Sequence, residues 1–286
     1  MIWHLGVIGG SGLAEGLDLD DAQEIAVSSP FGTPSGPVIT GKIAGKRVTF
    51  IARHGKGHRL TPSAVDYRAN IDVLKRCGVT DVLSLSAIGS LAEDMAPGHF
   101  VAVDQFIDRT QGRCGSFFGE GLVAHVSLAD PVCARLSKLA ADAAEASGAT
   151  VHRGGCYIAI EGPQFSTRAE SRLYRQWGAQ VIGMTAMPEA RLGREAELPY
   201  AVLGMVTDYD CWRDGEAVAA SEVFAVMKAN AALARETVRK LVVSLPKKRS
   251  ASPVDTALDG AIVTAPGARD GNLAAMLDAV AGRVLR

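Results

Sequence analysis

The sequence of 286 residues lacks the patterns that mark disulfide-stabilised, metal-binding and membrane-spanning proteins. Its five cysteines are widely spread and include no C-x-x-C pair, which predicts reduced thiols. Its six histidines form no H-E-x-x-H motif and no cluster with zinc spacing, so we expect no metal site. No apolar run approaches the ~20 residues that a membrane helix requires, so we expect no membrane contact.

A large excess of either charge is also missing. The formal net charge is −1, and the Lys and Arg residues are scattered rather than clustered. This pattern argues against a nucleic-acid partner, which requires a basic surface. The first residues lead directly into a strand-like pattern instead of a signal peptide. We therefore expect a cytoplasmic protein whose partner is a small molecule.

Apolar composition, at 48%, is sufficient for a large core in one α/β domain or two small ones. Strand-length apolar runs alternate with amphipathic helical stretches, which predicts a largely parallel or mixed central sheet flanked by helices. The expected strands are residues 5–8, 38–43, 47–52, 81–85, 99–106, 156–160, 179–182 and 201–206. The expected helices are residues 62–76, 131–146, 167–177, 188–197 and 221–245. We predict a single domain over 1–286, with a C-terminal appendage, 246–286, packed on or near the active site and a last helix from about Asn272.

A glycine-rich turn, Gly9-Gly10-Ser11-Gly12, follows the first expected strand. Without a Cβ, its backbone N–H groups can approach a phosphate. The dinucleotide fingerprint fails because Glu15 stands where a glycine is required. A nucleophile elbow around Ser11 fails because Leu13 occupies the last glycine position. The turn is therefore a candidate phosphate contact or only a tight turn.

Two further strand ends carry anion donors. Arg53 and His54 follow the strand 47–52, and the segment 84–90 gives way to small residues with free hydroxyl and N–H groups. Ligands of α/β sheets bind where the strands end. The planar Arg fork suits phosphate oxygens, and His adds a further donor. Each segment alone also fits a solvated surface, but together they predict an anion site.

Asp208 and Asp210 lie two residues apart after the strand 201–206. In extended backbone both carboxylates would point the same way, and their proximity would raise one of the two pKa values. A neutral carboxyl of this kind could protonate a purine nitrogen, although two surface aspartates would look the same in sequence. Phe165 stands in a loop, 161–170, that enters a helix with Ser166 or Thr167 as N-cap. It could provide a flat face for a base or be buried.

Taken in order, these motifs resemble the trimeric branch of the purine nucleoside phosphorylases, and within it the methylthioadenosine-specific members. The resemblance covers residues from about 5 to about 245. The matching segments are Gly9-Gly10-Ser11-Gly12-Leu13, Ala52-Arg53-His54-Gly55, Tyr67-Arg68-Ala69-Asn70-Ile71, Asp104 to Thr110, Glu161-Gly162-Pro163-Gln164-Phe165-Ser166 and Thr207-Asp208-Tyr209-Asp210-Cys211-Trp212. Gly183 stands where Asn is common in the family, and Ser11 and Ser86 stand where many members have Thr.

The resemblance implies a nucleoside phosphorylase-like fold, a homotrimer, and no cofactor besides inorganic phosphate as co-substrate. It implies phosphate contacts from Ser11, Arg53, His54, Ser86, Ala87 through its backbone, and Thr185. It implies nucleoside contacts from Phe165, Ser166, Met184, Asp208, Asp210 and a neighbouring subunit's His125. The segment 218–224 resembles the family's lid, with Val223 and Phe224 as an apolar wall.

The implied reaction is phosphorolysis of 5′-methylthioadenosine, with Asp208 as the acid at purine N7. Two aspartates suit the amino group and N7 of adenine better than a 6-oxo purine, for which Asn would be expected. Other purine nucleosides stay open as substrates, namely 5′-deoxyadenosine, methylthioinosine and inosine. A nucleosidase that uses water and a purine-binding module without catalysis are the alternatives.

Overall fold

The computed structural model describes residues 2–14, 16–213 and 219–285 as strands and helices that alternate along the chain. The strands are β1 (His4–Gly9), β2 (Asp20–Ile25), β3 (Val38–Ile43), β4 (Lys46–Ala52), β5 (Asp81–Ser90), β6 (Phe100–Val103), β7 (Gln105–Arg109), β8 (Val151–Arg153), β9 (Cys156–Ile160), β10 (Val181–Gly183) and β11 (Tyr200–Asp208). The helices are α1 (Ser11–Ala14), α2 (Tyr67–Arg76), α3 (Ala134–Ala146), α4 (Arg168–Gln176), α5 (Ala186–Glu195), α6 (Ala220–Ser244), α7 (Gly271–Met276) and α8 (Gly282–Leu285).

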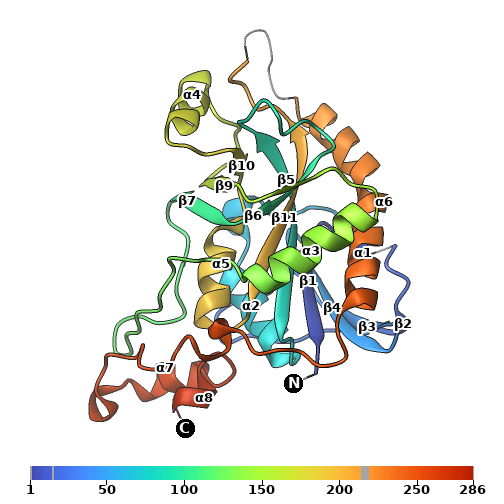
Figure 1. The fold of residues 1–286 in the computed structure, drawn as a ribbon. Helices are drawn as coiled ribbons and strands as arrows, with labels where there is room; N and C mark the ends of the chain where they lie inside the picture. Colours follow the sequence, from blue (N-terminus) through green and yellow to red (C-terminus); the bar gives the residue numbers. More distant parts are fainter. Residues whose placement is uncertain (1, 15, 214–218, 286) are drawn as a thin grey trace.

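All the strands belong to one mixed sheet, which confirms the predicted fold class (Figure 1). Strands β4, β1, β5 and β11 lie side by side and parallel, so their carboxyl ends meet at the same edge. Strand β6 is antiparallel to β11, and β10 is antiparallel to β5. The carboxyl ends of the four parallel strands are the place where an α/β sheet binds ligands.

Strand β5 creates an opening in this sheet. It pairs with β1 as far as Ser84, and only Gly89 and Ser90 pair with β10. Between these points residues 85–88 pair with β11 on one side, and neither β1 nor β10 continues the register on the other. Ser86 and Ala87 therefore lie inside a strand, which corrects the expectation that the strand ends before them. The open edge still leaves this backbone accessible to a ligand.

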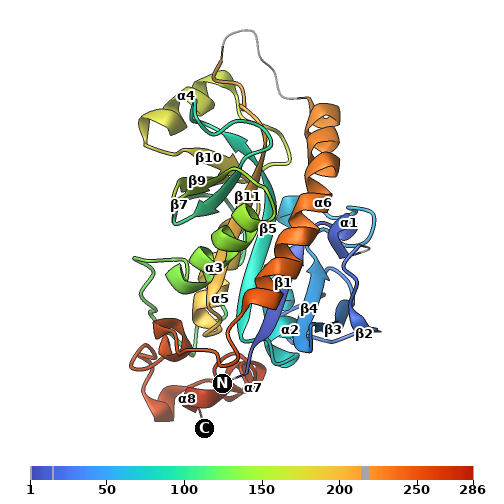
Figure 2. The same cartoon turned by 45° about the vertical axis from the view of Figure 1, so that its right-hand side comes forward.

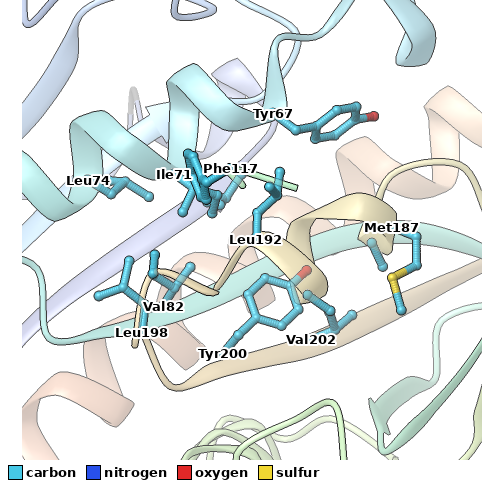
Figure 3. Packing of buried hydrophobic residues seen from close by; sticks show 14 of the residues in the cluster. Tyr67, Ile71, Leu74, Val82, Phe117, Met187, Leu192, Leu198, Tyr200 and Val202 are labelled. Atoms are coloured by element: carbon cyan, nitrogen blue, oxygen red, sulfur yellow. The ribbon is translucent and has the colours of Figure 1, made fainter. Parts of the chain in front are cut away.

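Helices cover both faces of the sheet, and the core is divided accordingly (Figures 1 and 2). One cluster joins Ile71 of α2 and Leu192 of α5 to strand residues such as Val82 and Val202 (Figure 3). The other joins Leu136 of α3 and other residues of α3 and α6 to the opposite face. Two packed faces fix the strand positions and therefore the positions of the residues at their ends.

Residues 246–285 pack at the amino ends of the strands, beside the N-terminus in both views (Figures 1 and 2). Arg249 is buried and forms an ion pair with Asp81, the first residue of β5. The N–H of Leu258 donates to Glu197 Oε1 over 2.9 Å, just beyond the end of α5. The appendage thus lies at the opposite end of the sheet from the candidate site of its own chain. This corrects the expectation that it packs on or near that site, because its buried Arg finds its counter-ion at the amino end of β5.

The appendage instead holds the loop that carries His125. The His125 N–H donates to the Ala261 carbonyl over 2.9 Å, and the Val263 N–H donates to the Val123 carbonyl over 3.0 Å. Ala124 and Ile262 form a bridge between these two bonds. The two segments therefore meet as a short antiparallel ribbon.

None of the helices in the described chain combines the length and the apolar composition needed to cross a bilayer. The described residues also contain no group of three or more His, Cys, Asp or Glu side chains placed to hold a metal ion.

Candidate active site

Arg53 follows β4 and lies buried beneath the opening in the sheet, with 3% of its surface exposed. Its Nε donates to Glu189 Oε1 over 2.5 Å, and its Nη2 donates to Ser84 Oγ over 2.6 Å. Its Nη1 donates to the Leu85 carbonyl over 3.2 Å. Burial alone would lower the pKa of Arg53, but the Glu189 carboxylate outweighs it and raises the pKa overall. The guanidinium is thus held in one orientation, with part of its hydrogen-bonding capacity left for a ligand.

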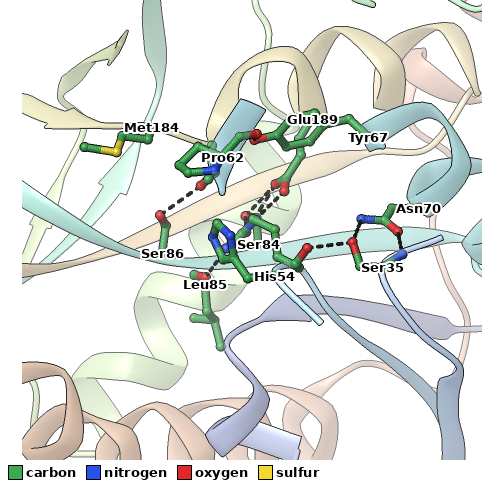
Figure 4. A network of polar contacts seen from close by, with 12 residues as sticks. Ser35, His54, Pro62, Tyr67, Asn70, Ser84, Leu85, Ser86, Met184 and Glu189 are labelled. Atoms are coloured by element: carbon green, nitrogen blue, oxygen red, sulfur yellow. Dashed lines mark hydrogen bonds and ion pairs between the residues drawn. The ribbon is translucent and has the colours of Figure 1, made fainter. Parts of the chain in front are cut away.

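Glu189, near the start of α5, is the centre of this polar network (Figure 4). Its Oε2 also accepts from Ser84 Oγ over 2.9 Å and from the Tyr200 hydroxyl over 2.8 Å. Sequence reasoning did not identify Glu189. A buried Arg requires a counter-ion, but the helix also contains Arg191, Arg194 and Glu195, so its sequence does not single out Glu189.

A second layer of contacts supports the backbone of Arg53. Ser35 Oγ donates to the Arg53 carbonyl over 2.6 Å, and Asn70 Nδ2 donates to Ser35 Oγ over 2.9 Å (Figure 4). The Ser35 N–H donates in turn to Asn70 Oδ1 over 2.9 Å. All three residues are buried, so the turn after β4 is fixed by satisfied hydrogen bonds.

His54 lies beside Arg53 at the same end of the sheet. Its Nδ1 is 2.9 Å from the Leu60 carbonyl, which can only accept, so Nδ1 carries the proton. Burial and the charge of Arg53 lower the pKa of His54 to about 4. The imidazole is therefore neutral near pH 7 and its one N–H faces Leu60, so the expectation that His54 adds a further donor to an anion needs revision.

Ser86 and Thr185 meet on the other side of the opening. Their hydroxyl oxygens are 3.4 Å apart, and both residues have 5% of their surface exposed. Thr185 precedes α5, and Ser11 begins α1 directly after β1. The predicted phosphate-binding residues therefore come from turns and strands that converge on one region, although the position of the Ser11 side chain lies outside the description.

Asp208 and Asp210 close β11 at the same edge of the sheet. Asp208 Oδ2 accepts from Thr207 Oγ1 over 2.6 Å, and its Oδ1 accepts from the Asp210 N–H over 2.8 Å. Asp210 Oδ2 is buried and has no hydrogen-bond partner among the described residues. Burial raises the pKa of both carboxyls, and the charge of Asp208 raises that of Asp210 further.

The sequence argument for this pair relied on extended backbone, which the structure does not have. Asp210 has φ of 55°, and the register of β11 shifts between Val206 and Asp208. The two residues are nevertheless neighbours around Gly89: a Cβ added there would lie 3.0 Å from Asp208 Oδ1 and 3.7 Å from Asp210 Cβ. A glycine in β5 thus leaves room next to both carboxyls.

The predicted base-binding loop and the strand β10 approach each other closely. A Cβ added to Gly162 would lie 2.4 Å from Met184 Sδ, so only glycine fits there. Phe165 has 43% of its surface exposed, which excludes the alternative that it is a core residue. Ser166 Oγ is buried without a hydrogen-bond partner in the described chain. The structure thus brings Phe165, Ser166 and Met184 to one side of the site.

Arg113 joins these two segments and was not predicted. Its Nη1 donates to the carbonyls of Met184 and Met187 over 2.6 and 3.0 Å, and its Nη2 donates to the Glu161 carbonyl over 2.7 Å. Its Nε lies 3.1 Å from Glu161 Oε2. No local pattern around Arg113 signals this role, because its acceptors are backbone carbonyls of distant segments.

Tyr157 explains why position 183 is a glycine in this chain. A Cβ on Gly183 would lie 2.0 Å from the Tyr157 hydroxyl, so an Asn there would clash. The Tyr157 hydroxyl accepts from the N–H of Thr185 over 3.4 Å. The buried tyrosine thus fills the space of the side chain common in the family and supports the start of α5.

The remaining predicted residues lie at the periphery. Phe224, near the start of α6, has 53% of its surface exposed, and its ring contacts His58 edge to face at 6.0 Å. Val223 is half-buried, and Val218 falls outside the described residues. His125 is exposed in the loop held by the appendage, so the structure does not bring it into the site of its own chain.

A model of the phosphorylase superfamily matches residues 4–245, and the chain therefore belongs to this family. It is 55% identical over 285 residues to S-methyl-5′-thioadenosine phosphorylase of Bradyrhizobium diazoefficiens, covering 99% of this chain and 98% of the relative. It is 56% identical over 286 residues to the enzyme of that name from Cereibacter sphaeroides, with 99% and 98% coverage.

Solved structures agree with these relatives. A methylthioadenosine phosphorylase from an antarctic soil metagenomic library has a TM-score of 0.93 and 42% identity, covering 98% of this chain and 99% of the other. Methylthioadenosine phosphorylase from Schistosoma mansoni in complex with adenine has a TM-score of 0.80 and 36% identity, covering 84% and 91%.

Proposed function

We propose that this chain cleaves 5′-methylthioadenosine with inorganic phosphate to give adenine and 5-methylthioribose 1-phosphate. The observation that carries the proposal is identity of 55% and 56% with methylthioadenosine phosphorylases over nearly the whole chain. The anion-binding groups and the buried carboxyl pair at one edge of the sheet provide the matching chemistry.

At the anion end, a phosphate oxygen forms a bond to C1′ as the bond from C1′ to N9 breaks. Glu189, Ser84 and the Leu85 carbonyl accept four of the five N–H groups of Arg53, so Arg53 donates to phosphate through the remaining N–H of Nη1. Ser86 and Thr185 add hydroxyl donors. The proposed set also includes Ser11, His54 and the Ala87 backbone. Bound phosphate stabilises the positive charge that develops on the ribose.

At the purine end, the electron pair of the broken bond enters the base, and an acid at N7 neutralises it. General acid catalysis of this kind typically contributes ~10²–10⁴-fold in rate. The raised pKa values of Asp208 and Asp210, and the proximity of the two carboxyls, favour a pair that shares one proton. The donors to both oxygens of Asp208 favour its ionised form, and the charge of Asp208 raises the pKa of Asp210. We therefore assign the proton to Asp210, the reverse of the assignment from sequence alone.

One ionised and one protonated carboxyl match the amino donor and the N7 acceptor of adenine. A 6-oxo purine would place an acceptor against the ionised group, so inosine-type substrates are disfavoured. At the 5′ end, Val223 and Phe224 form the proposed apolar wall, which suits a methylthio group. One methylene in such a pocket changes specificity by only ~1–3 kcal/mol, so 5′-deoxyadenosine is a plausible second substrate.

Phosphate dependence tests the proposal. We expect turnover of methylthioadenosine to require phosphate and to yield free adenine with a sugar 1-phosphate. Adenosine, 5′-deoxyadenosine and inosine, each compared with and without phosphate, would rank the substrates. Equal turnover without phosphate would identify a nucleosidase instead, and nucleoside binding without any turnover would identify a binding module.

We also propose a homotrimer, located in the cytoplasm, in which His125 reaches the site of a neighbouring subunit. Its exposure and its place in the loop held by the appendage support this role. Light scattering should give a mass three times that of the chain or a multiple of it. A fully active monomer would contradict the shared site.

A further inference from the structure

We propose that His54 accepts a hydrogen bond from the protonated oxygen of inorganic phosphate, and that this contact lets the site discriminate hydrogen phosphate from sulfate. The inference deepens the proposed function and rests on it, because it assumes that the anion site described above holds the phosphate nucleophile. It concerns the direction of one hydrogen bond and therefore the identity of the anion.

The loop that follows His54 fixes the imidazole. The Leu60 N–H donates to the His54 carbonyl over 3.1 Å, while His54 Nδ1 donates to the Leu60 carbonyl over 2.9 Å. The ring of His58 stacks on that of His54 with centroids 4.2 Å apart and planes 18° apart. These contacts set both the position and the tautomer of the ring, because the partner of one ring nitrogen decides which nitrogen carries the proton.

The surroundings of His54 keep the ring neutral. Burial and the positive charge of Arg53 lower its pKa to about 4, and His58 and Arg113 act in the same direction. The hydrogen bond to the Leu60 carbonyl opposes these effects. With the single proton on Nδ1, Nε2 presents a lone pair. Nε2 has no hydrogen-bond partner in the described part of the chain, so it is available to a ligand.

A lone pair at Nε2 suits only an anion that carries a proton. Hydrogen phosphate and hydrogen arsenate each have one O–H group at neutral pH, whereas sulfate has none. Sulfate at this position would place its oxygen against a second acceptor, leaving both without a donor. Arg53 does not discriminate between the two anions, because a guanidinium donates to phosphate and sulfate oxygens alike. Selection by the O–H group thus follows from the neutral His54.

Competition between anions tests the inference at constant ionic strength and neutral pH. We expect arsenate to replace phosphate as co-substrate. We expect sulfate to bind at least ~10-fold more weakly than phosphate, which is the loss expected for one hydrogen bond to a charged group. His54→Phe retains a ring against His58 but has no acceptor. This variant should have an affinity for phosphate that is lower by ~10-fold or more, whereas its inhibition constant for sulfate should change by less than ~2-fold. The matched control, His58→Phe, should keep the wild-type ratio of phosphate to sulfate affinity.

A second measurement needs no substitution. In protein labelled with ¹⁵N-histidine, the His54 Nε2 resonance should show an unprotonated nitrogen with inorganic phosphate bound at pH 7. A protonated Nε2 in that complex would overturn the inference, as would equal affinity of the wild-type protein for sulfate and phosphate. A parallel loss of both anions in His54→Phe would also overturn it, since a donating His54 would serve them equally.

Failure of this inference is distinguishable from failure of the proposed function. Phosphate-dependent turnover without anion selectivity would reject the role of His54 alone. Anion binding can also be measured by calorimetry with phosphate and sulfate, without turnover. Selective phosphate binding by a protein that cleaves no nucleoside would reject the proposed function while supporting the role of His54.

Discussion

Replacing the proton-bearing member of the Asp208 and Asp210 pair by Asn should lower kcat for methylthioadenosine by ~10²-fold or more. Asn cannot transfer a proton to N7, but its amide can donate to a 6-oxo group. Activity on inosine should therefore fall less than activity on methylthioadenosine, or rise. The ratio of 6-amino to 6-oxo turnover, measured for both single variants and the wild type, isolates this effect from general destabilisation.

The two assignments of the proton give different expectations. The hydrogen bonds to both oxygens of Asp208 favour the larger loss of kcat for Asp210→Asn. The assignment from sequence favours the larger loss for Asp208→Asn. If the ratio of activities is the same in all three proteins, neither carboxyl acts on the purine. If both aspartates lie on the surface, each Asn substitution should also change the free energy of unfolding by no more than ~0.5 kcal/mol.

Removing Arg53 should have a large effect on both stability and phosphate binding. Arg53→Ala leaves the buried Glu189 carboxylate without its counter-ion, so the free energy of unfolding should fall by ~3–5 kcal/mol. The remaining folded protein should show a higher KM for phosphate than the wild type, with a smaller change in the KM for nucleoside. Denaturant unfolding and initial-rate kinetics measure the two effects separately.

The double variant Arg53→Met with Glu189→Leu provides the control. Replacement of a buried ion pair by apolar side chains is often neutral, so most of the lost stability should return. Phosphate affinity should not return, because the guanidinium is still absent. If the double variant binds phosphate as tightly as the wild type does, Arg53 does not belong to the anion site. If Arg53→Ala is as stable as the wild type, the buried Glu189 carboxylate does not need the charge of Arg53 as its counter-ion.

Most of the sheet could be predicted from apolar runs, and β3 and β9 have the predicted bounds. Strand β2 could not, because its sequence, DDAQEI, is exposed throughout and pairs only with β3 at the sheet edge. Strand β5 extends past the predicted end because β11 pairs with it as far as Gly89, although Ser86, Gly89 and Ser90 do not signal a strand. The expected strand 99–106 is two strands, β6 and β7, with different partners.

The residues of the candidate site also fall into those that could be predicted from the sequence and those that could not. Arg53, His54 and the two aspartates could be predicted because polar residues directly follow apolar strands. Glu189 and Arg113 could not, because their roles depend on partners far away in the chain, Arg53 for the first and the Glu161 and Met184 carbonyls for the second. The neutral state of His54 depends on burial and on the charge of Arg53, and its tautomer depends on the Leu60 carbonyl, none of which is encoded by the spacing of residues.

The ribbon formed by residues 123–125 and 261–263 sets an order on the folding of a newly made chain. A growing polypeptide folds from its N-terminal part as it emerges from the ribosome. The last strand of the sheet ends at Asp208, but the segment 123–125 has no ribbon partner until residues 261–263 follow. Its pairing therefore postdates synthesis of the sheet by some 50 residues, counted from Asp208 to Ala261. A subunit released before that point would contain its sheet and helices but would present an unpaired loop to any neighbouring copy.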